Sequence, residues 1–170
     1  RMAIGATVFP VIWDVRSTYG RAYGNASTYL TAFLAPFRPT LALRVGGEKV
    51  WGEFPFQDAA FIGDASSVRL GRQNRYGGDA AVFANAELRI RLSQIFLVLP
   101  GHIGLLALGD VGRVYLEGEE SDRWHNAIGG GVWISFLSPA NTMSVALARS
   151  EVGTSVDQRT SLYIKGGFAF

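Results

Sequence analysis

The sequence predicts an all-β fold: a transmembrane, antiparallel up-and-down β-barrel whose eight strands form one domain over residues 1–170. Three observations predict it. Apolar residues alternate with small or polar ones between turn signals, which is the pattern of strands. Two long uncharged stretches could span a bilayer as helices, but Pro and Gly interrupt both of them. Short and long connections alternate along the chain, as they do in membrane barrels.

The composition excludes several other classes of protein. Only 18% of the residues are charged and 48% are hydrophobic, which excludes intrinsic disorder. The absence of Cys excludes a disulfide scaffold and a thiolate site, and with two His we expect neither a metal nor a cofactor. Basic residues are scattered singly despite the net charge of +2, so we expect no nucleic-acid partner. No leader precedes Arg1, so we expect a mature protein or an excised piece.

Alternation of side chains defines each strand. In the clearest strand, Leu88, Ile90 and Leu92 share one face, and Glu87 and Arg89 share the other. The same pattern, bounded by turn residues, predicts eight strands, at Met2–Thr18, Ala26–Phe37, Thr40–Trp51, Ala80–Gln94, His102–Leu116, Trp124–Leu137, Asn141–Glu151 and Arg159–Phe170.

The connections suggest where the barrel resides. We expect tight turns at three places, Phe37–Thr40, Leu99–Gly101 and Ser138–Asn141. Longer, more polar links alternate with them, at Tyr19–Asn25, Glu53–Asp79, Glu117–Arg123 and Val152–Gln158. Barrels of the bacterial outer membrane have short periplasmic turns and long external loops. We therefore expect this chain to contact outer-membrane lipids, with residues 53–79 as a long extracellular loop.

A soluble barrel or sandwich would show the same alternation, so the content of the polar faces has to decide. Those faces carry Arg44, Glu87, Asp110 and Lys165 among many Gly, Ala and Ser residues. Small and ionic residues together line a wet lumen rather than a dry core. We therefore predict that the apolar faces point outward to lipid and the ionic faces point inward.

The C-terminal segment Lys165-Gly166-Gly167-Phe168-Ala169-Phe170 reads as polar, Gly, any, apolar, any, apolar. It resembles the signal by which bacterial outer-membrane proteins are delivered to their assembly machinery. The resemblance implies that this machinery is a partner and that the residues recognised by it are Lys165, Gly166, Phe168 and Phe170.

Three internal motifs resemble the barrel of the BamA/TamA surface-antigen superfamily, which contains outer-membrane insertases and translocases. They are Val68-Arg69-Leu70-Gly71-Arg72, Asn85-Ala86-Glu87-Leu88-Arg89 and Leu108-Gly109-Asp110-Val111-Gly112-Arg113-Val114. The match runs in family order over nearly the whole chain. It corresponds to the C-terminal eight strands of the family's sixteen-stranded barrel.

The resemblance implies a role for the longest link. In the family this link folds into the lumen as a lid, and its Arg pairs with acidic residues on the inner wall. Arg69 is then the lid arginine and Asp110 its partner, with Glu87 as a second candidate. The implied site comprises Val68, Arg69, Gly71 and Arg72 in the link and Glu87, Arg89, Asp110 and Gly112 on the wall.

Two details bear on this contact. Gly112 lies on the same strand face as Asp110 and would let the loop backbone approach the wall. The family usually has Gly directly after the lid Arg, whereas Leu70 stands there in this chain. Arg72 and Arg75 are therefore alternative partners for Asp110.

Eight strands closed on themselves leave an interior that side chains nearly fill, so a long lid would not fit inside. A small closed barrel with its loop outside, or capping the mouth, is the arrangement we expect for a single chain. The alternatives are the C-terminal half of a sixteen-stranded barrel, or a homodimer in which two copies complete one barrel. An unclosed half would leave two costly edges in lipid.

For function, the resemblance implies a barrel of the insertase or translocase type, or a membrane anchor, with a client or passenger protein as partner. The alternative is a passive structural or adhesive barrel. An enzyme is less favoured, because neither His102 nor His125, the latter near Ser121 and Asp122, is accompanied by a nucleophile-elbow motif. We therefore expect no catalytic residues.

Overall fold

The structure is a computed structural model that describes residues 1–11, 16–96, 98–119, 123–152 and 157–167. Within these ranges the backbone forms strands and turns, and its only helical segment is a short 3-10 turn, η1 (Phe56–Asp58). No helix in the described part of the chain is long and apolar enough to cross a membrane. The predicted all-β class is confirmed.

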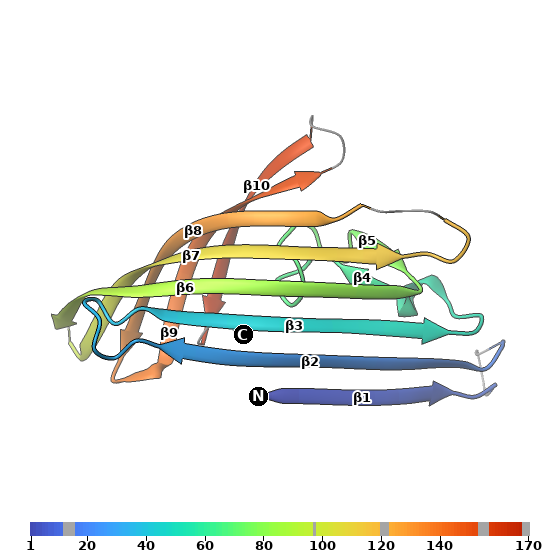
Figure 1. The fold of residues 1–170 in the computed structure, drawn as a ribbon, viewed down its shortest axis with the longest axis horizontal. Helices are drawn as coiled ribbons and strands as arrows, with labels where there is room; N and C mark the ends of the chain where they lie inside the picture. Colours follow the sequence, from blue (N-terminus) through green and yellow to red (C-terminus); the bar gives the residue numbers. More distant parts are fainter. Residues whose placement is uncertain (12–15, 97, 120–122, 153–156, 168–170) are drawn as a thin grey trace.

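Eight strands form one antiparallel sheet in which spatial order follows chain order (Figure 1). The connection 52–79, between the third and fourth of these strands, carries η1 and a separate small hairpin of β4 (Ala60–Ile62) and β5 (Tyr76–Gly78). The predicted up-and-down order of eight strands is confirmed. The strands are β1 (Met2–Phe9), β2 (Tyr19–Thr31), β3 (Thr40–Trp51), β6 (Ala80–Phe96), β7 (Pro100–Tyr115), β8 (His125–Phe136), β9 (Ser138–Val152) and β10 (Asp157–Gly166).

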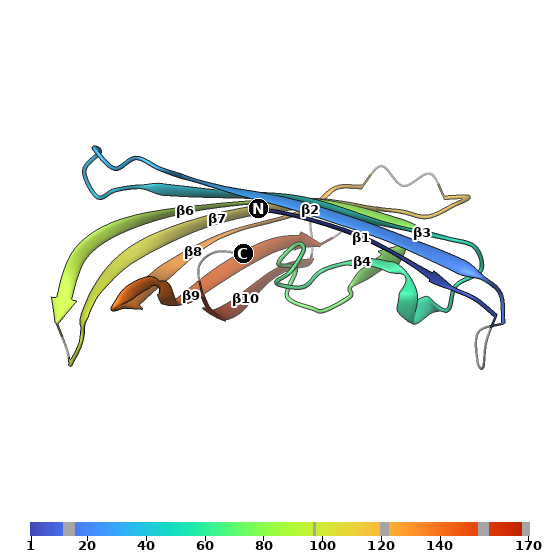
Figure 2. The same ribbon diagram turned by 90° about the horizontal axis from the view of Figure 1, so that it is seen from below.

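The sheet is strongly curved, and the connection 52–79 lies on its concave side (Figure 2). Its order begins at β1 and ends at β10, and no pair of described residues joins these two strands. The expected closure of eight strands on themselves is therefore not seen. The concave space holds a loop of more than twenty residues, for which a closed eight-stranded barrel has no room.

The two faces of the sheet have opposite chemistry. On the convex face Leu88, Val145 and Ile164 are exposed, the last to 67%. On the concave face Glu87 and Arg89 are only 3% and 2% exposed. The predicted orientation, with apolar side chains outward and ionic ones inward, is confirmed.

One predicted link is wrong. Residues Tyr19–Asn25 form the first half of β2, and the preceding strand, expected to reach Thr18, ends at Phe9. The polar residues of this segment suggested a link, but in the sheet they pair with both β1 and β3. In the sheet, Gly5 pairs with Tyr23, and a Cβ on Gly5 would collide with the tyrosine ring. Glycine here makes room for an aromatic ring on the neighbouring strand.

The turn predicted at Ser138–Asn141 is also displaced, because β9 already begins at Ser138. The chain reverses at Leu137, which has a positive φ of 61° and whose N–H donates to the carbonyl of Pro100 at 2.9 Å. Pro100 likewise opens β7 rather than lying in the turn expected at Leu99–Gly101. Proline is tolerated at the start of a strand because the missing N–H need not join the ladder there.

Candidate functional site

The tip of the long connection is shaped by a local hydrogen-bond turn at Asp64. The backbone N–H groups of Ser66 and Ser67 donate to Asp64 Oδ1 at 3.0 and 2.9 Å, and both hydroxyls donate to the same carboxylate. Burial alone would raise the pKa of Asp64, but these hydrogen bonds outweigh it and lower the pKa below its ordinary value. A charged Asp64 therefore fixes the turn that precedes the tip.

The tip itself is buried on the concave face. Val68 and Leu70 are both fully buried, and they join a hydrophobic cluster with residues of β2, β3, β4, β6 and β8. Since the side chains on either side of Arg69 are apolar and buried, the tip is held by packing as well as by charge. This packing fixes the position from which the Arg69 side chain extends.

Arg69 contacts Asp110 through a two-pronged ion pair. Its Nε and Nη2 donate to Oδ2 and Oδ1 of Asp110, both at 2.6 Å, and its backbone N–H donates to Oδ2 at 3.1 Å. Nη1 reaches Glu87 Oε2 at 3.4 Å. Burial alone would lower the pKa of the Arg69 guanidinium, but the hydrogen bonds and charge of Asp110, with those of Glu87, raise it. The expected contact between Arg69 and Asp110 is present, and Glu87 is a second partner.

Two neighbours complete this ionic cluster, which we define as Arg69, Asn85, Glu87, Arg89 and Asp110. The side-chain amide of Asn85 donates to Asp110 Oδ1 at 2.9 Å and to the carbonyl of Ser67 at 2.5 Å. Arg89 Nε donates to Glu87 Oε1 at 2.6 Å. The cluster thus links β6, β7 and the loop through side chains that are all nearly inaccessible to solvent.

A second set of contacts holds the loop to the other side of the concave space. The N–H of Gly71 donates to the hydroxyl of Tyr163 on β10 at 2.8 Å, and the hydroxyl of Ser150 on β9 donates to the carbonyl of Leu70 at 3.4 Å. Gly71 has a φ of 78°, which favours glycine. The loop therefore bridges the middle of the sheet and its last two strands.

Gly112 provides the space that the tip occupies. A Cβ at this position would lie 2.5 Å from Cγ2 of Val68. We expected this glycine to admit the loop backbone, but it is a side chain of the loop that fills the space. On this strand face, Gly112 thus leaves space for Val68, and Asp110 pairs with Arg69.

The other predicted loop residues lie outside the ionic cluster. Arg72 is exposed, and Arg75 stacks on Tyr76 with its guanidinium carbon 5.6 Å from the ring centre. Neither takes the place of Arg69 at Asp110. Arg69 is therefore the loop arginine that contacts Asp110 on the wall.

The C-terminal signal is described only in part. Lys165 and Gly166 belong to β10, where they pair with Ser144 and Met143 of β9. Phe168 and Phe170 lie outside the described residues. The predicted recognition of this segment by the assembly machinery stays a prediction.

The two histidines weighed for catalysis are not members of the ionic cluster, although His102 lines a pocket together with Arg89. His125 stacks on the ring of Tyr76, with centroids 3.8 Å apart and planes 20° from parallel. His102 lines a pocket at the other end of β7. Ser121 and Asp122 lie outside the described residues. No group of three His, Asp or Glu side chains in the described ranges is arranged to hold a metal ion.

The sequence analysis assigned no role to Asn85, although Asn85 begins one of the quoted motifs, and none to Tyr163. Asn85 shares a strand face with Glu87, so the alternation in that strand held a signal for it. Tyr163 meets a loop residue 92 positions away, and no local pattern indicates such a contact.

Comparison with known proteins identifies no relative: no family model, curated protein or solved structure matches the chain. What the arrangement can do therefore follows from its geometry. It clamps a loop onto the concave face through a buried ion pair and spans the sheet with it.

Proposed function

We propose that the chain is part of the wall of a bacterial outer-membrane β-barrel related to the BamA/TamA insertases and translocases. In this role it is the membrane-embedded barrel, or the anchor, of a system for protein assembly or translocation. The observation that carries the proposal is the inverted arrangement of the sheet, with buried ionic residues on its concave face and exposed apolar residues on its convex face.

Lipid is the surrounding that best suits the convex face. Soluble proteins rarely expose a large continuous apolar surface, whereas the lipid-facing side of a membrane barrel consists of one. Exposed apolar side chains recur here on every second position of successive strands, among them Met2, Ile4, Val8, Leu30, Val45, Val132, Leu147 and Leu162.

The open edges of β1 and β10 support a wider barrel. Unpaired backbone groups are costly in lipid, so the edges require further strands. We propose that this chain forms the C-terminal half of a sixteen-stranded barrel, whose lumen has room for the long connection. A homodimer that pairs these edges is the other arrangement that satisfies them.

The clamped loop favours an active barrel over a passive structural or adhesive one. Ordering a long loop inside a wet lumen costs conformational entropy, and the buried contact of Arg69 with Asp110 and Glu87 offsets that cost. A passive wall has no need of such a device. The clamp resembles the lid expected for the family.

Membrane insertion is tested by a charge on the convex face. Val145→Arg in the full-length protein is expected to remove it from the outer-membrane fraction, since a mid-strand Arg facing lipid costs about 2–4 kcal/mol. Val145→Ala is the matched control. Heat-dependent gel mobility reports folding in both variants. Normal recovery of folded Val145→Arg in the outer membrane would contradict the proposal.

Activity is tested separately. The complete barrel that contains this chain, reconstituted in liposomes, is expected to speed the folding of a small unfolded outer-membrane barrel, and Arg69→Ala is expected to slow it. The 170-residue chain alone is expected to show no such activity. If the unfolded client barrel folds no faster than in empty liposomes, the alternative of a passive structural or adhesive barrel is supported instead.

A further inference from the structure

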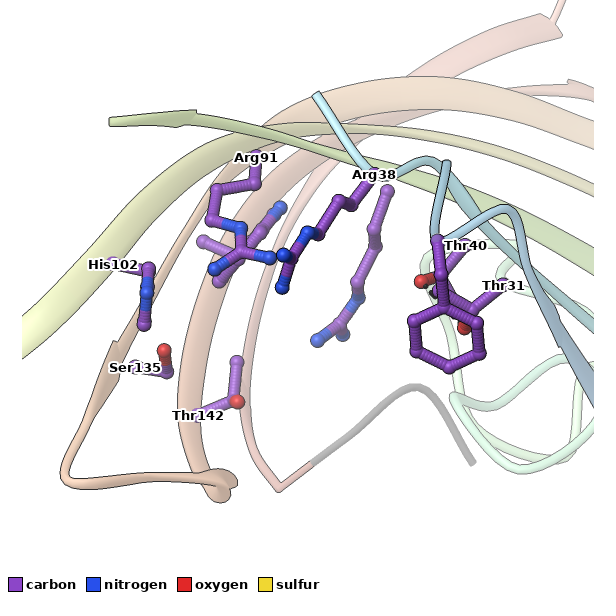
Figure 3. Close-up of a pocket in the computed structure, with 10 residues that line it drawn as sticks. Thr31, Arg38, Thr40, Arg91, His102, Ser135 and Thr142 are labelled. Atoms are coloured by element: carbon purple, nitrogen blue, oxygen red, sulfur yellow. Dashed lines mark hydrogen bonds between the residues drawn. The ribbon is translucent and has the colours of Figure 1, made fainter. Parts of the chain in front are cut away.

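A pocket of about 330 Å³ opens on the concave face at the end of the sheet where the short turns lie (Figure 3). Its walls come from the turn between β2 and β3 and from β6, β7, β8 and β9. The pocket does not include Arg69 or Asp110, and Arg89 is the one member of the ionic cluster that lines it. The contact of Arg69 with Asp110 and Glu87, which holds the loop, therefore does not account for this pocket.

Three arginines line this pocket. Arg89 of β6 is paired with Glu87, and the other two, Arg38 from the turn and Arg91 from β6, point toward one another across it (Figure 3). Among the described residues neither guanidinium has an ion-pair partner, and no Asp or Glu is found among the side chains that line the pocket. Two positive charges facing one hollow repel each other unless an anion lies between them. The pocket is thus electrostatically suited to a doubly charged anion.

The backbone holds the two arginines in place. The N–H of Arg91 donates to the carbonyl of Phe37 at 2.9 Å, which ties the turn to β6 beside the pocket. Phe37 and Arg38 both have positive φ, 62° and 42°, so the turn reverses sharply at this point. Two guanidinium groups that are far apart in the chain are thereby brought to the same rim.

The deeper wall of the pocket is polar and built into the sheet. His102, Ser135 and Thr142 follow one another across β7, β8 and β9 in register, and Ser135 and Thr142 are each 3% exposed. Their ring nitrogen and hydroxyl groups line the same hollow as the arginines. Phe33 and Trp133 add aromatic surface at its sides. An anion there would meet hydrogen-bond donors from several directions and an apolar wall beside it.

We propose that this pocket binds a phosphate group, free or as the head of a larger phosphate ester. A phosphate monoester carries about two negative charges at neutral pH, which match those of Arg38 and Arg91. Its three terminal oxygens use both guanidinium groups and the hydroxyls, whereas a carboxylate is already satisfied by one guanidinium. The remaining volume and the rings of Phe33 and Trp133 accommodate the group that the phosphate is attached to.

In the first test, the detergent-solubilised full-length protein, prepared in phosphate-free buffer, is titrated with inorganic phosphate, and calorimetry measures the heat of binding. Saturable binding is expected in the wild type. Arg38→Gln and Arg91→Gln are each expected to weaken it about tenfold, because each removes a charge-assisted hydrogen-bonding group. Arg123→Gln, at the opposite end of the sheet, removes the same charge outside the pocket and should bind as the wild type does.

Two further measurements separate the sources of the phosphate and guard against misfolding. Binding of phosphatidic acid, with phosphatidylcholine as the control lipid in mixed micelles, shows whether the phosphate is carried by a lipid or is the free ion. Weaker binding of either phosphatidic acid or inorganic phosphate by Arg91→Gln supports the site. Arg91→Lys, which keeps the charge but loses the planar donor pair, should bind more weakly than wild type while folding normally. The absence of saturable binding in both arms, or equal affinity in Arg91→Gln and Arg123→Gln, would overturn the proposal.

Discussion

The concave face contains two groups of arginines that differ in what faces them. Where the long connection fills the space, Arg69 is matched by Asp110 and Glu87, and protein surrounds all three. At the turn end, Arg38 and Arg91 face a hollow whose lining carries no carboxylate, and the third arginine of that lining, Arg89, is paired with Glu87. The difference teaches that a wholly buried arginine needs a carboxylate beside it: Arg69 and Arg89, the arginines buried in the described part of the wall, both have one, whereas Arg38 and Arg91 lie next to open space.

The largest effect is expected from removing Arg69, the arginine that has carboxylate partners. Arg69→Ala leaves the carboxylates of Asp110 and Glu87 buried without their counter-charge, and is expected to lower the stability of the docked loop by about 3 kcal/mol. The rate of proteolysis within residues 52–79 of the folded protein measures the docking, and the urea midpoint measures the whole barrel.

Arg72→Ala is the control within the same motif. Arg72 is exposed, so its removal should change neither measurement beyond about 0.5 kcal/mol. Similar proteolysis of the two variants would mean that the ion pair does not hold the loop.

The next largest effect is steric. Gly112→Ala places a methyl group 2.5 Å from Cγ2 of Val68 and is expected to weaken loop docking by about 2 kcal/mol, since a filled contact does not accept additional volume. Gly109→Ala, on the same strand, is the matched control because no atom lies within 4 Å of its added Cβ. Proteolysis of the loop compares the two.

The same substitution can be rescued. Val68→Ala combined with Gly112→Ala removes the colliding methyl group, so the pair should dock better than Gly112→Ala alone. Additive losses in the double variant would show that the glycine acts through the strand and not through the space it leaves for Val68.

Whether the sequence predicts a contact in this wall depends on how far apart in the chain the two residues lie. Alternation within a strand is local, so it correctly predicted that Glu87 lies inside and Leu88 outside. The contact of Arg69 with Asp110 was predicted only through the family resemblance. The hydroxyl of Tyr163 meets the loop from 92 residues away, and nothing in its surroundings indicates that partner.

The errors have a local cause. The segment Tyr19–Asn25 was interpreted as a polar link, because the sequence alone does not reveal that its residues pair with a strand on each side. The facing of Arg38 and Arg91 was likewise hidden, since it depends on a turn with two consecutive positive φ angles. Both features arise from neighbouring strands, which sequence alternation alone does not specify.

A smaller effect is expected on the far side of the loop. Tyr163→Phe removes the hydroxyl that accepts from the N–H of Gly71, and should weaken docking by about 1 kcal/mol. Hydrogen exchange at Gly71 is expected to accelerate while the exchange at Arg69 changes less. An unchanged rate at Gly71 would show that β10 does not hold the loop.

The smallest effect concerns Asp64, the residue that shapes the turn before the tip. Its pKa is lowered from the ordinary 3.8, so its contribution is fully present above that pH and is lost as the pH falls through the depressed folded value. Asp64→Asn should therefore destabilise the docked loop at pH 7, by less than about 1 kcal/mol because water partly screens the carboxylate. Below pH 3.8, the difference in loop stability between Asp64→Asn and the wild type should shrink. Hydrogen exchange measures this difference without depending on a protease. A difference that grows on acidification would mean that the protonated acid, and not the carboxylate, holds Ser66 and Ser67.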